Sequence, residues 1–116
     1  MLVASGLGAR RPIDDMPRLA RMLAQADLVV TARIDGRLVG VARAITDFSY
    51  CCYLSDLAVD GAHQRQGIGR RLIAETRTSA GLGTTLVLVA APGADAVYRQ
   101  VGLEPFSRCW GIRRTS

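Results

Sequence analysis

The stretch Leu54-Ser55-Asp56-Leu57-Ala58-Val59, followed after four residues by Gln64-Arg65-Gln66-Gly67-Ile68-Gly69-Arg70-Arg71-Leu72, decides the fold. Its first part ends an apolar run, Tyr50–Val59, that predicts a central strand. Its second part opens a helix that we expect to continue to about Ser79. A glycine-rich turn between a strand and a helix presents backbone N–H groups at a helix N-terminus, where a phosphate binds well. The stretch therefore predicts an anion site.

Two better-known phosphate-binding patterns do not fit this turn. A GxGxxG dinucleotide fingerprint starting at Gly67 needs its third glycine at residue 72, which is Leu72. A Walker A loop needs a lysine, and the chain contains none. What remains is the spacing Gln64-x-x-Gly67-x-Gly69, in which a pyrophosphate is held largely by the backbone.

Three further strands are predicted on either side of this stretch. Leu28–Ile34 is rich in β-branched residues and leads through Asp35-Gly36, a strong hairpin signal, into Leu38–Ile45. We expect these two segments to form an antiparallel pair. Downstream, Thr85–Ala90 is almost continuously aliphatic, which predicts a strand buried on both faces and parallel to Tyr50–Val59.

Two helices and a terminal segment complete the prediction. Apolar residues recur at helical spacing between Asp14 and Ala26, with Asp14 or Asp15 as the cap, and a short helix is predicted over Ala94–Val101. After it, apolar residues alternate with polar ones and indicate a closing β segment: Phe106, Trp110 and Ile112.

Length and composition indicate one domain over residues 1–116, since 116 residues at 49% hydrophobic content can bury their own core. No apolar run approaches the roughly 18 residues that cross a bilayer, and Met1–Ala9 lacks the pattern of a signal peptide. We therefore expect a cytoplasmic protein with no membrane partner. The cysteines Cys51, Cys52 and Cys109 and the single histidine lack ligand-like spacing, so we expect no metal.

The formal net charge of +5 raises the question of a polyanionic partner. Most arginines are spread along the chain, which is typical of a solvated surface, and we expect no nucleic-acid partner. Arg65, Arg70 and Arg71 differ because they surround the glycine-rich turn. They either add charge to the anion site or are solvated side chains.

The segment Leu54–Leu72 resembles motif A of the GCN5-related N-acetyltransferase (GNAT) family. Further along, Ala96–Glu104 resembles the family's Tyr-x-x-x-Gly-Phe segment, with Leu103 in place of the usual Phe. The resemblance extends from Leu28 to the C-terminus. It implies an α/β (α+β mixed sheet) fold, the GNAT acyl-CoA N-acyltransferase fold, in which a central, mostly antiparallel sheet with one splayed parallel pair is flanked by helices.

The resemblance also implies acetyl-CoA (coenzyme A) as cofactor. Its pantetheine would bind the amides of Leu57–Val59, and the amide near Leu57 would stabilise the oxyanion formed when an amine attacks the thioester. Its pyrophosphate would bind the amides of Arg65–Arg70. The expected cofactor-binding residues are Leu57, Ala58, Val59, Gln64, Arg65, Gln66, Gly67, Ile68, Gly69, Arg70 and Arg71.

Two catalytic residues are expected. Tyr98 matches the family tyrosine whose hydroxyl protonates the departing CoA thiolate, although a tyrosine on an amphipathic helix is also a common packing residue. The amine must lose a proton to a base, for which Asp56 is the first candidate and Asp47 the second. Strand alternation would turn Asp56 to the face opposite Leu57, and a salt bridge within the sheet explains it equally well.

The implied function is transfer of the acetyl group of acetyl-CoA to a primary amine of a small molecule or protein, by direct attack in a ternary complex. The alternative is a non-catalytic acyl-CoA-binding or regulatory module, because the sequence starts after the family's usual first strand and most of its first helix. Met1–Gly8 is similar to the tail of that helix. The outer edge of Leu28–Ile34 would then be unpaired, so we expect a homodimer or a strand from a neighbour.

Overall fold

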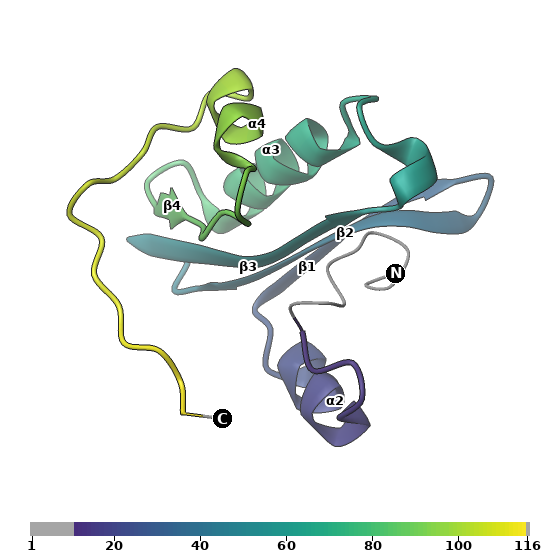
Figure 1. The fold of residues 1–116 in the computed structure, drawn as a ribbon, viewed down its shortest axis with the longest axis horizontal. Helices are drawn as coiled ribbons and strands as arrows, with labels where there is room; N and C mark the ends of the chain where they lie inside the picture. Colours follow the sequence, from purple (N-terminus) through teal and green to yellow (C-terminus); the bar gives the residue numbers. More distant parts are fainter. Residues whose placement is uncertain (1–10, 116) are drawn as a thin grey trace.

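The computed structural model describes residues 11–115 and shows one four-stranded mixed sheet with strand order β1-β2-β3-β4 (Figure 1). The pairs β1–β2 and β2–β3 are antiparallel, and β3–β4 is parallel. This arrangement confirms the predicted mixed sheet. The strands are β1 (Leu28–Ile34), β2 (Arg37–Thr46), β3 (Cys51–Val59) and β4 (Thr85–Val87).

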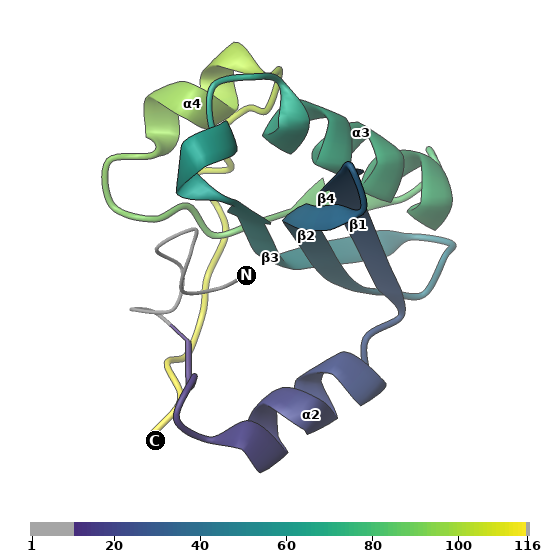
Figure 2. The same cartoon turned by 90° about the vertical axis from the view of Figure 1, so that its right-hand side faces the viewer.

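Helices lie on both sides of the sheet (Figure 2). The helices α3 (Ile68–Ala80) and α4 (Asp95–Gln100) lie on one side, and α2 (Met16–Ala24) lies on the other. A 3-10 turn, η2 (Gly61–His63), joins β3 to the loop before α3. Of the two predicted caps for the first of these helices, Asp15 is the one observed: its Oδ1 accepts a hydrogen bond from the Arg18 N–H at 3.1 Å.

The core lies between the sheet and α3. Leu54 of β3 and Ala42 of β2 pack against Leu72 and Ile73 of α3. Burial of each large aliphatic side chain stabilises the fold by about 1.5–3 kcal/mol. A second buried group continues this layer toward the end of α3: Ala44, Cys52 and Ala80.

One glycine lets α3 lie close to the sheet. A Cβ on Gly40 of β2 would lie 3.0 Å from the Leu72 Cδ1 and 3.2 Å from the Ile68 Cγ2. Both of these residues belong to the first two turns of α3, so the missing side chain sets the height of the helix N-terminus above β2.

The C-terminal part of the chain differs from the prediction. Pairing with β3 covers only Thr85–Val87 rather than Thr85–Ala90, and Thr85 is exposed while the other two residues are half-buried. The expected closing β segment is not formed within the described residues: the chain beyond Gly102 contains no strand and runs away from the sheet (Figure 1). Trp110 and Ile112 are 91% and 101% exposed.

Strand pairing explains both differences. The edge strand β4 offers only three residues for a further strand to follow, and Pro105, on the path back toward it, has no N–H to donate to a ladder. Alternation alone therefore could not produce a strand after Gly102. The prediction for Met1–Gly8 lies outside the described residues. Within the described range, none of the helices has the length and apolar character to cross a membrane.

Candidate functional site

A β-bulge divides β3 into two halves. Arg43 of β2 is opposite Asp56, whereas the next residue, Ala44, is opposite Leu54, so Ser55 is an extra residue without a partner. Such a bulge shifts by one residue the side chains and backbone groups that follow it.

Before the bulge, β3 is hydrogen-bonded on both edges. The Cys51 carbonyl accepts from the Asp47 N–H, toward β2, and the Tyr50 carbonyl accepts from the Thr85 N–H at 2.9 Å, toward β4. Because successive residues point their backbone groups to opposite edges, even-numbered residues of this half face β4.

After the bulge, odd- and even-numbered residues exchange the edges that their backbone groups face. The Asp60 N–H donates to the Val39 carbonyl at 2.8 Å, toward β2, so by alternation the N–H groups of Leu57 and Val59 point to the other edge. Among the described residues, β4 pairs only with Cys51–Tyr53 and does not reach this half. The predicted splayed pair therefore exists, with the two N–H groups facing the gap.

The loop before α3 presents further N–H groups. The N-cap Gly67 has a φ of 83° and, among the described residues, no side chain caps the helix. The first intrahelical bond runs from the Arg71 N–H to the Gly67 carbonyl at 3.1 Å, which leaves the N–H groups of Ile68–Arg70 without intrahelical acceptors. A Cβ on Gly67 would meet nothing within 4 Å, so the space before the helix is open.

The predicted polar side chains around this loop have different surroundings. The Gln64 Nε2 donates to the Val59 carbonyl at 3.1 Å and ties the loop to the end of β3. The Arg70 Nη2 donates to the Gln100 carbonyl at 2.9 Å, which links α3 to the end of α4. Arg71 is exposed and lies 4.0 Å from Glu75, and Arg65 is exposed.

Tyr98 lies on α4 and is half-buried. It packs against the core cluster of Leu54, Leu72 and Ile73, and so does Leu57 of the open half of β3. The structure therefore brings the side chain of the predicted acid to the same face of the sheet as the side chain of Leu57.

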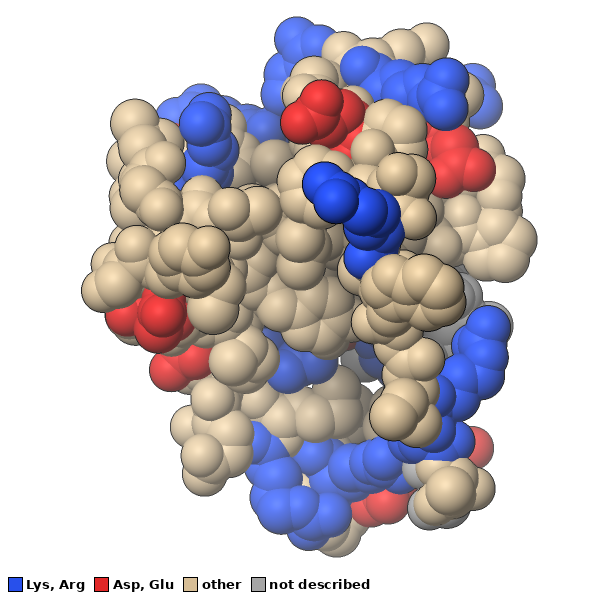
Figure 3. Space-filling model, turned by 90° about the vertical axis from the view of Figure 1, so that its left-hand side faces the viewer, with Lys and Arg blue, Asp and Glu red and all other residues tan. Residues whose placement is uncertain are grey.

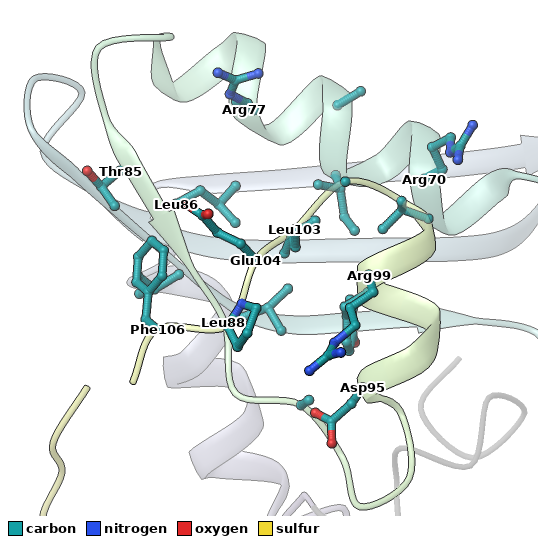
Figure 4. Close-up of a pocket in the computed structure, with 18 of the residues that line it drawn as sticks. Arg70, Arg77, Thr85, Leu86, Leu88, Asp95, Arg99, Leu103, Glu104 and Phe106 are labelled. Carbon is teal, nitrogen blue, oxygen red and sulfur yellow. The ribbon is translucent and has the colours of Figure 1, made fainter. Parts of the chain in front are cut away.

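A cavity of about 650 Å³ lies between α3, β4, α4 and the segment after Gly102 (Figure 4). Its floor is aliphatic and includes Leu86 and Leu88, whereas Arg77, Asp95 and Glu104 stand at its rim. Of the predicted site residues, Arg70 and Tyr98 line it, whereas Leu57–Val59 and the rest of the glycine-rich loop do not.

Asp56 lies on the opposite face of the sheet from Leu57. Asp56 is 5% exposed, and its carboxylate forms salt bridges with Arg11 and Arg43. The salt bridge that we expected as the alternative to a catalytic role is therefore present. Burial raises the pKa of Asp56, but hydrogen bonds from Arg43 and Arg11 outweigh this effect and leave the pKa below its ordinary value.

Asp47, the second predicted base, holds the turn between β2 and β3. Its Oδ1 accepts hydrogen bonds from the N–H groups of Tyr50, Ser49 and Cys51 at 2.8–3.1 Å. These bonds, with that of Tyr50 the strongest, lower the pKa of Asp47 from 3.8 to about 2. The turn lies at the far end of β3 from the gap.

Comparison with known proteins identifies the family. Residues 11–108 match the family model described as an acetyltransferase (GNAT) domain. The chain belongs to the GNAT family. It is an acetyltransferase of that family. A comparison with curated protein sequences found no significant match.

Solved structures support the fold of this GNAT domain. A GNAT-family protein from Streptococcus pneumoniae is 25% identical, with a TM-score of 0.75 over 86% of this chain and 79% of its own. An aminoglycoside acetyltransferase from a soil metagenomic sample is 26% identical, with a TM-score of 0.67 over 88% and 74%. The aminoglycoside N-acetyltransferase AAC(6')-Iy in complex with CoA is 21% identical, with a TM-score of 0.68 over 90% and 79%.

GNAT acetyltransferases use acyl-CoA, and the open backbone groups can be compared with what such a ligand needs. An extended amide chain can pair with the N–H groups of Leu57 and Val59 as an added strand would. A pyrophosphate can accept from the uncapped turn at Ile68–Arg70, where a helix dipole favours negative charge and nothing fills the space before Gly67. The residues present therefore fit an acyl-CoA.

On the face of this GNAT domain that Figure 3 shows, the basic residues do not form one continuous surface. They lie at the top, near the centre and along the lower right of the view, with uncharged and acidic residues between them. A local anion site fits this distribution better than a long polyanion does.

Sequence reasoning missed Arg11, Arg43 and Ser55, which surround Asp56 in this GNAT domain. A signal was present for Arg43, a lone charged residue within the apolar run Leu38–Ile45. A charge in a predicted central strand requires a partner, and Asp56 is the only acidic residue in Tyr50–Val59. For Arg11, 45 residues away in sequence, no such signal existed.

Proposed function

We propose that the chain transfers the acetyl group of acetyl-CoA to a primary amine of a small molecule or a protein, by direct attack in a ternary complex. The observation that carries this proposal is the pair of N–H groups at Leu57 and Val59, which face a gap beside the uncapped N-terminus of α3. N–H groups on an unpaired strand edge can bind a ligand that supplies carbonyl acceptors, as an added strand would.

The residues that would hold acetyl-CoA act mainly through their backbone. Leu57–Val59 would bind the pantetheine amides, and the N–H groups of Ile68–Arg70 would bind the pyrophosphate. Arg65 and Arg71, both exposed beside the loop, would add positive charge, and Gln64 would fix the loop to β3. When bound, acetyl-CoA supplies an acyl group activated as a thioester.

The chain's own groups then act on the charges that develop. The Leu57 N–H points to the gap and would donate to the acyl oxygen as that oxygen gains negative charge. The Tyr98 hydroxyl, on the same side of the sheet, would give a proton to the departing sulfur. A phenol of pKa about 10 can donate to this thiolate because its pKa is only about 1.5 units above the thiol pKa of about 8.5.

The general base stays a prediction. Asp56 and Asp47 both have lowered pKa values, which makes each a weak proton acceptor at neutral pH. The pH profile of kcat in an Asp56→Asn variant tests the role of Asp56. If Asp56 is the base, the fall of kcat at low pH disappears in the variant. A residue that only positions the strand would lower the profile and leave its pKa unchanged.

The first experiment is calorimetric titration with acetyl-CoA of the wild type and of Gly67→Glu, whose carboxylate would enter the open space before α3 and repel a pyrophosphate. We expect saturable binding in the wild type and a loss of at least 100-fold in the variant. Gly36→Glu is the matched control, because Gly36 in the β1–β2 turn has a similar φ of 78° and equally open surroundings. No binding by the wild type contradicts the proposal.

Turnover is then measured as CoA thiol release with a panel of amines. Aminoglycosides belong in the panel because two of the similar structures are aminoglycoside acetyltransferases. Binding without turnover on any amine, together with no effect of Tyr98→Phe, would indicate the non-catalytic acyl-CoA-binding module instead.

We also propose that the chain forms a homodimer. Among residues 11–115, no strand pairs with the outer edge of β1, and Val29 and Ile34 on this strand are exposed. An open apolar edge favours association. Sedimentation at several concentrations tests this, and a concentration-independent monomer would overturn it.

A further inference from the structure

The carboxylate of Asp56 is shared by two arginines on the face of the sheet opposite α3. The Arg11 Nε lies 2.6 Å from its Oδ1, and the Arg43 Nε bonds its Oδ2. All three side chains are largely buried. Both oxygens of the carboxylate are therefore occupied by guanidinium groups, in an arrangement well screened from water.

Both arginines also bind the bulged residue. The Arg11 Nη2 donates to the Ser55 carbonyl at 2.6 Å, and the Arg43 Nη2 donates to the Ser55 Oγ at 3.0 Å. Between Cys52 and Val59, Ser55 is the residue that the pairing with β2 skips. Its backbone and its side chain are thus each held by one arginine, and Asp56 fixes the position of both.

The bulge matters because it decides which N–H groups face the gap. Without the extra residue, the alternation of the first half of β3 would continue, and the N–H of Leu57 would point to β2, as Cys51 and Tyr53 do. With it, the N–H of Leu57 points to the open edge. A bulge interrupts the ladder and needs other bonds to keep its register, and these three side chains provide them.

We propose that Arg11, Arg43 and Asp56 are positioning residues, which lock the Ser55 bulge and so aim the Leu57 N–H at the acyl oxygen. This inference rests on the proposed function. A donor that acts on charge developing in the transition state affects kcat more than binding, since most of the affinity for a CoA molecule would come from the loop and α3.

Three variants remove the lock in steps. Ser55→Ala removes only the hydroxyl that accepts from Arg43. Arg43→Lys keeps the positive charge but cannot reach both Asp56 and Ser55, because it lacks the planar fork of the guanidinium group. Asp56→Asn removes the charge that holds both arginines, and it is also the variant most at risk of unfolding.

The measurements are kcat, KM for acetyl-CoA, the dissociation constant for CoA without the acyl group, and Tm. We expect kcat to fall about 3-fold in Ser55→Ala, about 10-fold in Arg43→Lys and about 100-fold in Asp56→Asn, with a smaller rise in the CoA dissociation constant, because the loop and α3 would still hold the pyrophosphate. Asp27→Asn is the control. The Asp27 carboxylate accepts from the Thr46 N–H at 2.9 Å, at the C-terminal end of β2 three residues beyond Arg43, so it supports the sheet next to the bulge rather than at it.

The outcomes separate this inference from the proposed function. If the variants and Asp27→Asn lose Tm alike while all keep the wild-type kcat, the three residues are only structural and the inference is overturned. The inference is also overturned if KM and the CoA dissociation constant rise while kcat stays constant. If the wild type neither binds CoA nor turns over, the proposed function fails first. Should Asp56→Asn not fold, the graded loss in the two milder variants decides the question.

Discussion

The two halves of β3 belong to one strand but have different surroundings. The half before Ser55 lies between β2 and β4 and is bonded on both edges, whereas the half after it pairs, among the described residues, with β2 as its one neighbouring strand. Both halves place aliphatic side chains against α3, among them Leu54 and Leu57. One extra residue therefore separates a strand that builds the core from a strand whose backbone is left open for a ligand.

This difference shows how a sheet can bind a ligand without disturbing its core. The bulge keeps the aliphatic side chains toward α3 on both sides of Ser55 while it exchanges the edges that the N–H groups face. Stability depends on side-chain packing and the proposed activity on backbone direction, so the two can be tested separately.

The largest effect should come from proline substitutions in the open half. Ala58→Pro removes an N–H that faces β2 and should lower the free energy of unfolding by about 2 kcal/mol or more. Leu57→Pro removes an N–H that faces the gap, so it should abolish measurable turnover at a smaller loss of stability. Urea unfolding and thiol-release assays on the pair compare the two edges, and equal losses of stability would contradict the assigned directions.

Tyr98→Phe tests the other side of the gap. Tyr98 packs against the same cluster as Leu57, and its ring would remain while its hydroxyl is lost. We expect kcat to fall about 100-fold, or about 2.7 kcal/mol in activation free energy, with Tm nearly unchanged. A wild-type kcat in this variant would show that the tyrosine is a packing residue.

Gly40→Ala tests whether the close approach of α3 to the sheet determines the position of the glycine-rich loop. The new Cβ would lie 3.0 Å from the Leu72 Cδ1, so the helix must move slightly outward, and we expect a loss of about 1 kcal/mol in unfolding free energy. Acetyl-CoA affinity should fall several-fold. Gly83→Ala, where the nearest atom is the Ser49 carbonyl oxygen at 3.9 Å, is the control for a glycine with ordinary space. Equal effects of the two would weaken the role of the close approach.

The smallest effect concerns the turn that leads into the first half of β3. The pKa of Asp47 is lowered from 3.8 to about 2, so this group contributes stability above pH 4 that is lost as the pH falls toward 2. Asp47→Asn keeps an acceptor for the turn but cannot titrate. Its Tm should therefore fall less steeply than that of the wild type between pH 4 and pH 2. The slope will not vanish, because the pKa of Asp56 is lowered too.

Local patterns predicted much of this molecule. The hairpin at Asp35-Gly36, the cap at Asp15 and the glycine-rich start of α3 depend on neighbouring residues, which a single sequence displays. The short β4 and the missing closing strand depend on which edge is available for pairing, a property of the assembled sheet.

The site was predicted unevenly for the same reason. The loop and Tyr98 are carried by motifs, and the structure places the loop at the uncapped N-terminus of α3 and Tyr98 against the core. Asp56 belonged to the same motif, yet its environment is made by Arg11, 45 residues away, and by a bulge that no composition reveals. A one-residue irregularity changes the direction of every following group and leaves no trace in the hydrophobic pattern.

Amide hydrogen exchange resolved by NMR, with and without acetyl-CoA, tests the central claim most directly. We predict that, without ligand, the amides of Cys52 and Ala58 exchange slowly while those of Leu57 and Val59 exchange fast, and that acetyl-CoA slows the latter two at least 10-fold with little change in the former. Slow exchange of Leu57 in the ligand-free protein, or no protection on binding, would contradict the open half of β3 as the acyl-CoA site.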